Sequence, residues 1–230
     1  MIRPQLCLSL LLCALGARGA AAQEIDSPYR FVDPGQQVNA FIGLIETDPG
    51  TLELGPESGM GYGIRYGIRL TGPFSIEGAG MLFPTTRVVQ DTVIEADGDT
   101  VTAPLEPRAE PDLTLGLVTA DLRFDITGPR TWHRLMPFAL LGVGAAFTMS
   151  ADDEADAELG SNLRYDFGTR LVGELGAGVE WFPAERLTVR LDARNMLWKI
   201  EAPVGLRTLD APIEEWVQNF LLSAGVSFRF

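Results

Sequence analysis

The sequence is poor in cysteine, histidine and lysine, and these shortages limit its chemistry. Its only cysteines, Cys7 and Cys13, lie in an apolar N-terminal segment. If this segment is removed after export, the remaining chain has no disulfide, no thiol nucleophile and no cysteine ligand for a metal. The single histidine is His133 and the single lysine is Lys199.

Basic charge is also scarce. The chain has 18 Lys and Arg residues against 31 Asp and Glu residues, and its formal net charge is −13. A phosphate backbone needs clustered basic side chains to neutralise it, so we exclude nucleic acid as a partner. Its 230 residues fit one ordinary domain, and 46% hydrophobic against 21% charged residues disfavours intrinsic disorder.

Long hydrophobic runs are missing too. A transmembrane helix needs about 20 consecutive apolar residues to span the bilayer. No later segment of this chain has even 18. Residues 1–22 combine Arg3, a short apolar run from Leu6 to Leu15, and small residues ending at Ala22. This pattern predicts a signal peptide cleaved after Ala22, and an N-terminal membrane anchor is the alternative.

Two-residue alternation, in contrast, is abundant. Between Gly59 and Leu70 the even positions are apolar, while the odd positions are glycine or arginine. Since successive side chains of a strand point to opposite faces, this pattern predicts a strand with one apolar and one polar face. Similar runs begin near residues 37, 74, 113, 135, 165, 187 and 219. In the run from Tyr165 to Trp181, we expect Tyr165 and Phe167 on the apolar face.

The connections between these eight strands alternate in length. Short turns rich in glycine and proline are expected at 71–73, 127–134 and 183–186, and longer polar loops at 48–57, 84–112, 150–162 and 201–215. This order predicts a meander of hairpins with both ends of the domain on the short-turn side. The predicted fold class is all-β, an eight-stranded antiparallel up-and-down transmembrane β-barrel.

An eight-stranded barrel can turn its apolar face inward, as lipocalin-like barrels do, or outward toward lipid. The charges favour the second choice, because each arginine directed at lipid would cost about 2–4 kcal/mol near the midplane. Inside a narrow lumen the same charges can pair, with glycines leaving room for long arginines. A solvated face of a soluble sandwich is the alternative. The predicted lumen ion network comprises Arg65, Arg69, Glu77, Asp121, Arg123, Asp125, Arg170, Glu174, Glu180, Arg190, Asp192, Arg194 and Arg229.

All four tryptophans occur near predicted strand ends. Aromatic girdles mark the two water–lipid boundaries of membrane barrels, so we predict that these side chains contribute to them. Trp198 has the inward parity, and its place in a girdle would require a bulge near Asn195 or a different strand end. The predicted girdle residues are Trp132, Trp181, Trp198 and Trp216.

The stretch from Trp216 to Phe230, together with glycine-rich segments at 137–144 and 173–179, resembles a known family. This is the group of small eight-stranded bacterial outer-membrane barrels that includes outer membrane protein A-like and W-like proteins. The resemblance implies location in the outer membrane of a Gram-negative-type bacterium. It also implies a periplasmic lead-in over 23–35, a barrel over 36–230, and outer-membrane lipid and the barrel assembly machinery as partners. The residues that match the assembly signal are Leu222, Ala224, Val226, Phe228 and Phe230.

Few residues suggest catalysis or metal binding. His133 lies in a short turn, on the side opposite to where lipid-modifying outer-membrane enzymes of this architecture place their catalytic groups. Two acidic segments, 91–99 and 152–158, do not have the spacing of an EF-hand loop, and we interpret them as solvated loops, with weak calcium binding as the alternative. We expect no catalytic residue, cofactor or metal site.

Three functions remain as hypotheses. The first is a non-enzymatic outer-membrane barrel with a packed, charged lumen, whose acidic extracellular loops contact a ligand or surface. The second is a narrow transport barrel for small solutes or apolar molecules. The third is a lipid-modifying enzyme, for which no nucleophile stands out.

Overall fold

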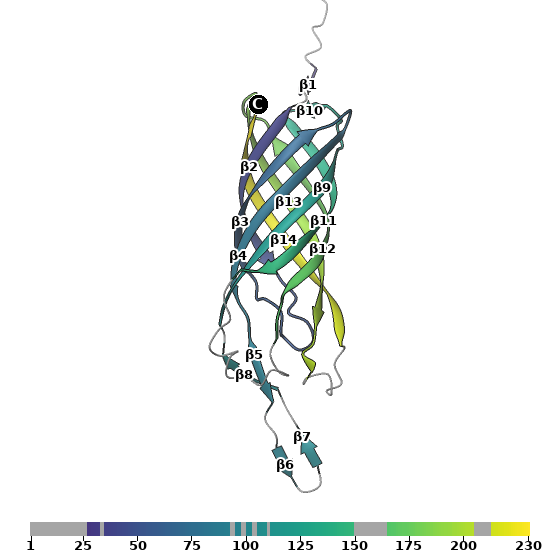
Figure 1. Cartoon of the computed structure of the whole chain (residues 1–230). Coiled ribbons are helices and arrows are strands. Elements are labelled where there is room, and N and C mark those ends of the chain that lie inside the picture. The colour runs from purple at the N-terminus through teal and green to yellow at the C-terminus, as the bar shows by residue number, and fades with distance from the viewer. Residues whose placement is uncertain are drawn as a thin grey trace, which may run out of the picture.

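Eight long strands form a closed antiparallel barrel in the computed structural model, which describes residues 27–32, 35–92, 95–97, 100–102, 105–109, 111–149, 165–204 and 213–230 (Figure 1). The barrel strands are β2 (Gln36–Glu46), β3 (Gly59–Arg69), β4 (Phe74–Thr86), β9 (Asp112–Asp125), β11 (Leu135–Thr148), β12 (Thr169–Trp181), β13 (Leu187–Glu201) and β14 (Glu214–Arg229). Pairing of β14 with β2, from Phe220↔Glu46 to Arg229↔Gln37, closes the ring. The predicted eight-stranded β-barrel is confirmed.

Short and long connections gather at opposite ends of the barrel (Figure 1). Residues 70–73, 126–134 and 182–186 make the short turns, at the same end as Phe230, and the other four connections lie at the far end. We call these the periplasmic and extracellular ends, following the known orientation of such barrels. No helix in the described part of the chain is long and apolar enough to cross a membrane.

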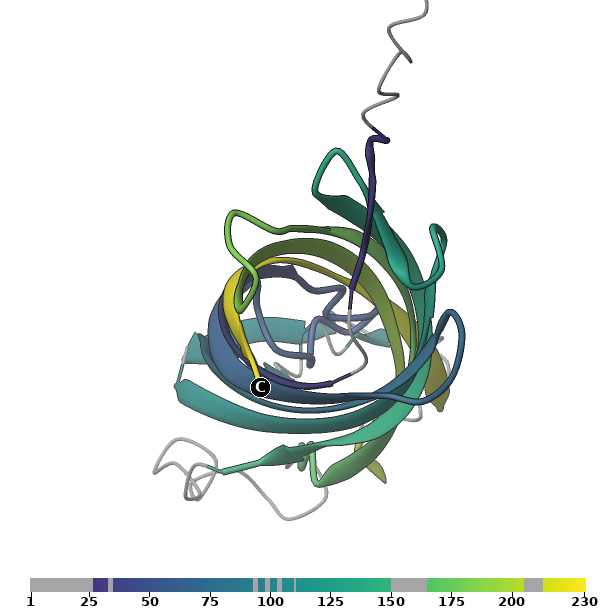
Figure 2. The ribbon, with the colours of Figure 1, turned by 90° about the horizontal axis from the view of Figure 1, so that it is seen from above.

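Shorter strands extend both ends. At the periplasmic end, β1 (Tyr29–Phe31) pairs with β10 (Arg130–Trp132), and the described chain resumes at Gly35 before β2 (Figure 2). Val32 packs there against Met136 and Phe182. At the extracellular end, the β4–β9 connection extends away from the barrel as two successive strand pairs (Figure 1). These pairs join β5 (Val89–Thr92) to β8 (Leu105–Ala109) and β6 (Glu95–Asp97) to β7 (Thr100–Thr102).

The barrel turns its apolar face outward. In β3, Tyr62 is 53% exposed and Ile64 is 65% exposed. Arg65, which lies between Ile64 and Tyr66 in the strand, is only 3% exposed. The same alternation exposes Ile42, Leu122, Leu141, Leu175 and Leu222 on other strands. A continuous apolar surface of this kind is suited to lipid rather than water. Since closed barrels with this belt span bacterial outer membranes, the chain is a transmembrane barrel of that type.

The segment before β12 differs from prediction. Tyr165 and Phe167 were expected on the outer apolar face, but they are 7% and 3% exposed and pack inside the barrel. The strand begins only at Thr169, after Gly168, which has a φ of +59°. This left-handed residue breaks the alternation, so parity counted back from β12 does not apply to the residues before it.

Candidate functional site

Charged side chains from six of the eight barrel strands meet inside the periplasmic half of the lumen. We call this group the ion network. Its arginines and carboxylates are equal in number, so their formal charges cancel. The members are Arg65, Arg69, Glu77, Asp121, Arg123, Asp125, Glu174, Glu180, Arg190, Asp192, Arg194 and Arg229.

Asp192 on β13 is the most connected carboxylate. It accepts hydrogen bonds from Arg65 Nη1 at 3.1 Å, Arg190 Nε at 3.1 Å and Arg194 Nε at 2.8 Å. The Ser223 hydroxyl donates a further bond to it at 2.9 Å. Asp192 is 2% exposed, so in this buried environment the three guanidinium groups replace the water that would otherwise solvate its charge.

Glu77 and Glu180 connect β4 with β12 through two arginines. Arg190 Nη1 donates to Glu77 at 2.7 Å, and Arg123 Nη1 donates to Glu77 at 3.0 Å and to Glu180 at 2.7 Å. Both guanidinium groups also lie near the ring of Phe138, with their central carbons 4.1 and 4.3 Å from its centroid. Arginine stacking on an aromatic face supplements the ion pairs.

Small residues give the charged side chains their space. Arg194 Nη1 donates to Asp121 at 2.9 Å and to Glu174 at 2.8 Å. A Cβ added at Gly142 would lie 1.9 Å from Asp121 Oδ1, so only glycine fits beside this carboxylate. Gly176 agrees with the prediction that lumen glycines leave room for long arginines, because a Cβ added there would lie 3.0 Å from Arg194 Cγ.

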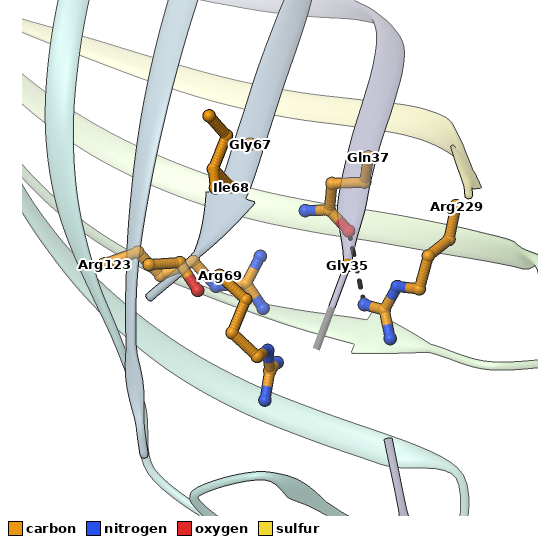
Figure 3. Close-up of a pocket in the computed structure, with 8 residues that line it drawn as sticks. Gly35, Gln37, Gly67, Ile68, Arg69, Arg123 and Arg229 are labelled. Carbon is orange, nitrogen blue, oxygen red and sulfur yellow. Dashed lines mark hydrogen bonds between the residues drawn. The ribbon is translucent and has the colours of Figure 1, made fainter. Parts of the chain in front are cut away.

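The periplasmic mouth of the network is rich in arginine (Figure 3). Arg69 Nη2 donates to Asp125 at 2.6 Å, and Arg229 Nη2 donates to Gln37 Oε1 at 3.3 Å. With Arg123, these side chains line a cavity of about 10 Å³. That volume corresponds to about one water molecule.

Arg170 was predicted to belong to the ion network, and the structure places it elsewhere. It lies at the extracellular start of β12, where Nη1 is 3.4 Å from Glu201 and Nε donates to the Phe167 carbonyl at 2.7 Å. Its side chain is 18% exposed, and that of Glu201 is 43% exposed. The parity of Arg170 in its strand correctly predicts that its side chain points inward. Parity does not predict how far along the barrel axis the residue lies.

The extracellular half of the lumen is apolar, which we had not predicted. Nearer the periplasmic end, the inward positions of β9 and β13 carry charged side chains. Nearer the extracellular end, the inward positions are apolar, with Leu115 and Leu117 on β9 and Met196 and Ile200 on β13. The signal was present in the sequence as apolar residues at successive inward positions, such as Leu113, Leu115 and Leu117. We call this cluster the apolar plug, which comprises Phe41, Ile45, Leu54, Met81, Phe83, Leu113, Leu115, Leu117, Ala146, Tyr165, Phe167, Val172, Met196, Trp198, Ile200, Val217 and Leu221.

Trp198 belongs to this plug and not to an aromatic girdle. It is completely buried and packs edge-on against Phe167, with ring centroids 6.1 Å apart. Because β13 and β14 pair without a register shift from Leu187 to Glu201, no bulge turns Trp198 outward. Trp132, Trp181 and Trp216 are exposed by 48%, 47% and 63%, respectively.

Burial in the plug also affects Tyr165. Its side chain precedes β12, and burial raises the pKa of its hydroxyl to about 12. The Arg87 guanidinium lies 5.9 Å from the centroid of its ring.

The residues of the predicted assembly signal line the outer face of the last strand. Leu222, Val226, Phe228 and Phe230 are each more than half exposed, and Ala224 shares their face. Backbone hydrogen bonds between Phe230 and Gln36, at 3.0 and 3.1 Å, join this strand end to β2. Recognition of these residues by an assembly machinery stays a prediction.

The remaining candidates are His133 and the two acidic segments. His133 is exposed in a periplasmic turn, with its ring 4.9 Å from that of Trp132. In the acidic segment 91–99, the side chains lie outside the described residues, although Asp91, Glu95 and Asp97 belong to β5 and β6. The segments 1–26 and 152–158 also lie outside them.

Comparison with known proteins gives a match at the level of structure. No protein-family model matches the chain, and no curated protein sequence is significantly similar to it. The crystal structure of Neisserial surface protein A is 16% identical with a TM-score of 0.51, covering 85% of this chain and 97% of that chain. The N-terminal β-barrel domain of OprF from Pseudomonas aeruginosa is 12% identical, with a TM-score of 0.47 and coverages of 86% and 100%.

OprG, an outer membrane protein of Pseudomonas aeruginosa, is 16% identical with a TM-score of 0.46 and covers 89% of this chain and 99% of that chain. The first of these three similarities extends over most of both chains and concerns the fold. Together with the closed ring of eight strands and the outward apolar belt, it shows that the chain has the fold of the small outer-membrane β-barrels.

Proposed function

We propose that the protein is a non-enzymatic outer-membrane barrel that does not conduct solutes and acts through its extracellular surface. The observation that supports this proposal is the double filling of the lumen. The ion network occupies the periplasmic half and the apolar plug occupies the extracellular half. A solute would have to break both to pass.

The remaining space in the lumen supports the same proposal. One cavity in the ion network has about 10 Å³, and another, at its boundary with the plug between Arg65, Arg194 and Met196, has about 20 Å³. Each is the size of about one water molecule, which is too small for a hydrated ion or a metabolite to pass. A barrel packed in this way is suited to holding loops in place rather than to transport.

The extracellular end offers the surface for such a role. The β5–β8 and β6–β7 pairs project the β4–β9 connection away from the barrel (Figure 1). This connection includes the acidic segment 91–99, and a second acidic segment at 152–158 follows β11. We infer that these loops contact an extracellular ligand or surface of complementary, positive charge.

Planar-bilayer recording of the purified full chain tests the closed lumen. We expect no discrete current steps above the bare-bilayer background, while heat-modifiable gel migration shows that the same sample is folded. Reproducible openings of a single size from wild-type protein would overturn the proposal in favour of transport. A Trp198→Ala variant should also stay closed, because the ion network still fills the periplasmic half of the lumen, and conduction by this variant would show that the plug is the only barrier.

Binding to supported bilayers or beads that carry positive charge tests the acidic loops. Replacing residues 93–104 with a short Gly-Ser turn should retain the barrel and reduce adsorption to polylysine-coated beads. The control is a variant with the same turn in place of residues 128–129 at the periplasmic end. Equal adsorption of wild type and both variants would exclude a role for this segment in binding.

A further inference from the structure

The periplasmic end carries positive charge that the ion network does not use. Among the described residues of the periplasmic turns and β1, the charged side chains outside the network are four arginines and one carboxylate. They are Arg30, Arg130, Arg134, Arg186 and Glu185. In a chain with a formal net charge of −13, this excess of arginine requires an explanation.

Two of these arginines line a surface pocket of about 410 Å³. The pocket lies between the β1–β10 ribbon, which contributes Arg30 and Thr131, and the β12–β13 turn, which contributes Phe182 and Glu185. Arg134 from the adjacent turn and Arg229 from the end of β14 also line it. Three arginines and one carboxylate are therefore among the described residues that line this pocket.

Arg229 links the pocket to the lumen. Its guanidinium lies 5.0 Å from the centroid of the Phe182 ring, and its Nη2 donates to Gln37 at 3.3 Å (Figure 3). The other terminal nitrogen, Nη1, is buried and has no hydrogen-bond partner among the described residues. Because an unpartnered buried donor is costly, a ligand oxygen in the pocket would be favoured if the Arg229 side chain turns Nη1 toward it.

The walls of the pocket also include apolar side chains. Phe31 is 66% exposed although it is a large aromatic residue, while Val32 and Phe182 are buried. Trp132 of the neighbouring strand β10 and Trp181, which precedes Phe182, lie on the outer surface at this end. Exposed tryptophans of this kind mark the depth at which lipid headgroups lie.

We propose that this pocket binds a phosphate group, with Arg30, Arg134 and Arg229 as its donors and Phe31 against the carbon atoms next to the phosphate. Forked guanidinium donors match the tetrahedral oxygens of phosphate in pairs. The phosphate can belong to a phospholipid headgroup of the inner leaflet or to a soluble periplasmic compound, and both present the same group. Arg30 and Arg134 lie outside the ion network, and Arg229 keeps its hydrogen bond to Gln37 through Nη2 while Nη1 serves the ligand.

Native mass spectrometry of the full chain in detergent tests this proposal with three probes. These are short-chain phosphatidylglycerol, inorganic phosphate, and a short-chain diacylglycerol that lacks phosphate. The site variant is Arg30→Gln with Arg134→Gln, and the matched control is Arg130→Gln with Arg186→Gln, which removes the same charge from the same end. All three proteins should show heat-modifiable migration, because the substituted side chains are exposed.

We expect wild type and control to bind phosphatidylglycerol alike and the site variant to bind about tenfold more weakly, the effect of losing charge-assisted hydrogen bonds. Glu185→Gln should have the opposite effect and strengthen binding. Binding of inorganic phosphate with the same ranking would identify a soluble ligand, and binding of the lipid alone would identify the headgroup. Equal weakening in both double variants, equal binding of diacylglycerol, or no complex with either phosphate probe would overturn the proposal.

Discussion

The two halves of the lumen are closed by different kinds of interaction. The periplasmic half holds paired arginines and carboxylates around Asp192 and Glu77, whereas the extracellular half holds aliphatic and aromatic side chains around Trp198. The same strands supply both, since β13 contributes Arg194 and Trp198 four residues apart on one face. Strand parity thus fixes which side chains enter the lumen, and position along the strand fixes their polarity.

This difference has consequences for how each half responds to mutation. In the ion network, removing one partner leaves its neighbours charged and buried, so the loss spreads to several residues. In the apolar plug, removing one side chain leaves a cavity, and the loss stays local. Substitutions in both halves, compared by urea unfolding in detergent micelles, test this distinction.

The largest effect is expected for Asp192→Asn. The amide keeps the size of the side chain but leaves Arg65, Arg190 and Arg194 without their shared negative charge. Breaking a buried ion pair in this way costs about 3–5 kcal/mol of unfolding free energy. Tryptophan fluorescence during urea unfolding measures this loss. A loss close to that of a surface pair, about 1 kcal/mol or less, would contradict a connected network.

Leu115→Ala tests the apolar plug. Leu115 is completely buried on β9, so its truncation should leave a cavity and cost about 3 kcal/mol. Val118→Ala on the same strand is the control, because Val118 is 55% exposed on the outer face and detergent or lipid can fill the space. Equal losses in the two variants would show that the plug is loosely packed.

A smaller loss of unfolding free energy is expected when a glycine is replaced by alanine, and its size should depend on whether the glycine faces the lumen or the lipid. A Cβ at Gly144 would lie 2.2 Å from the Val118 carbonyl oxygen inside the barrel, whereas a Cβ at Gly80 on the outer face would meet nothing within 4 Å. Gly144→Ala should therefore cost about 1–3 kcal/mol through overpacking. Gly80→Ala should change stability by at most about 1 kcal/mol. The same unfolding assay compares them, and equal values would contradict the crowding inside the lumen.

Much of this fold could be predicted from the sequence because parity is a local property. The alternation from Met60 to Leu70 specifies a strand and its lipid-facing side without knowledge of any other strand. The position of Tyr165 could not be predicted in this way, because it depends on the positive φ of Gly168. Tertiary contacts decide it, since Tyr165 packs in the plug with residues distant in sequence.

The candidate site was less predictable for a related reason. Parity identifies inward charges, but only the register between strands shows which of them lie at the same height. Arg194 and Asp121 are 73 residues apart in sequence and come together across the lumen. The apolar plug was not predicted because parity does not specify how polarity changes along a strand: Leu113 has the same inward parity as Asp121 and Arg123 but lies nearer the extracellular end.

The smallest effect is expected for Arg170→Gln, which tests the boundary between the two halves from outside the network. Arg170 lies beside the plug, paired with the partly exposed Glu201 at 3.4 Å. Water screens such a pair, so its removal should cost about 1 kcal/mol or less, even with the loss of hydrogen bonds to the preceding backbone. Unfolding free energies of Arg170→Gln and Asp192→Asn, measured under the same conditions, provide the comparison. Equal losses would mean that ionic closure extends to the extracellular mouth, and the division of the lumen into two halves would be wrong.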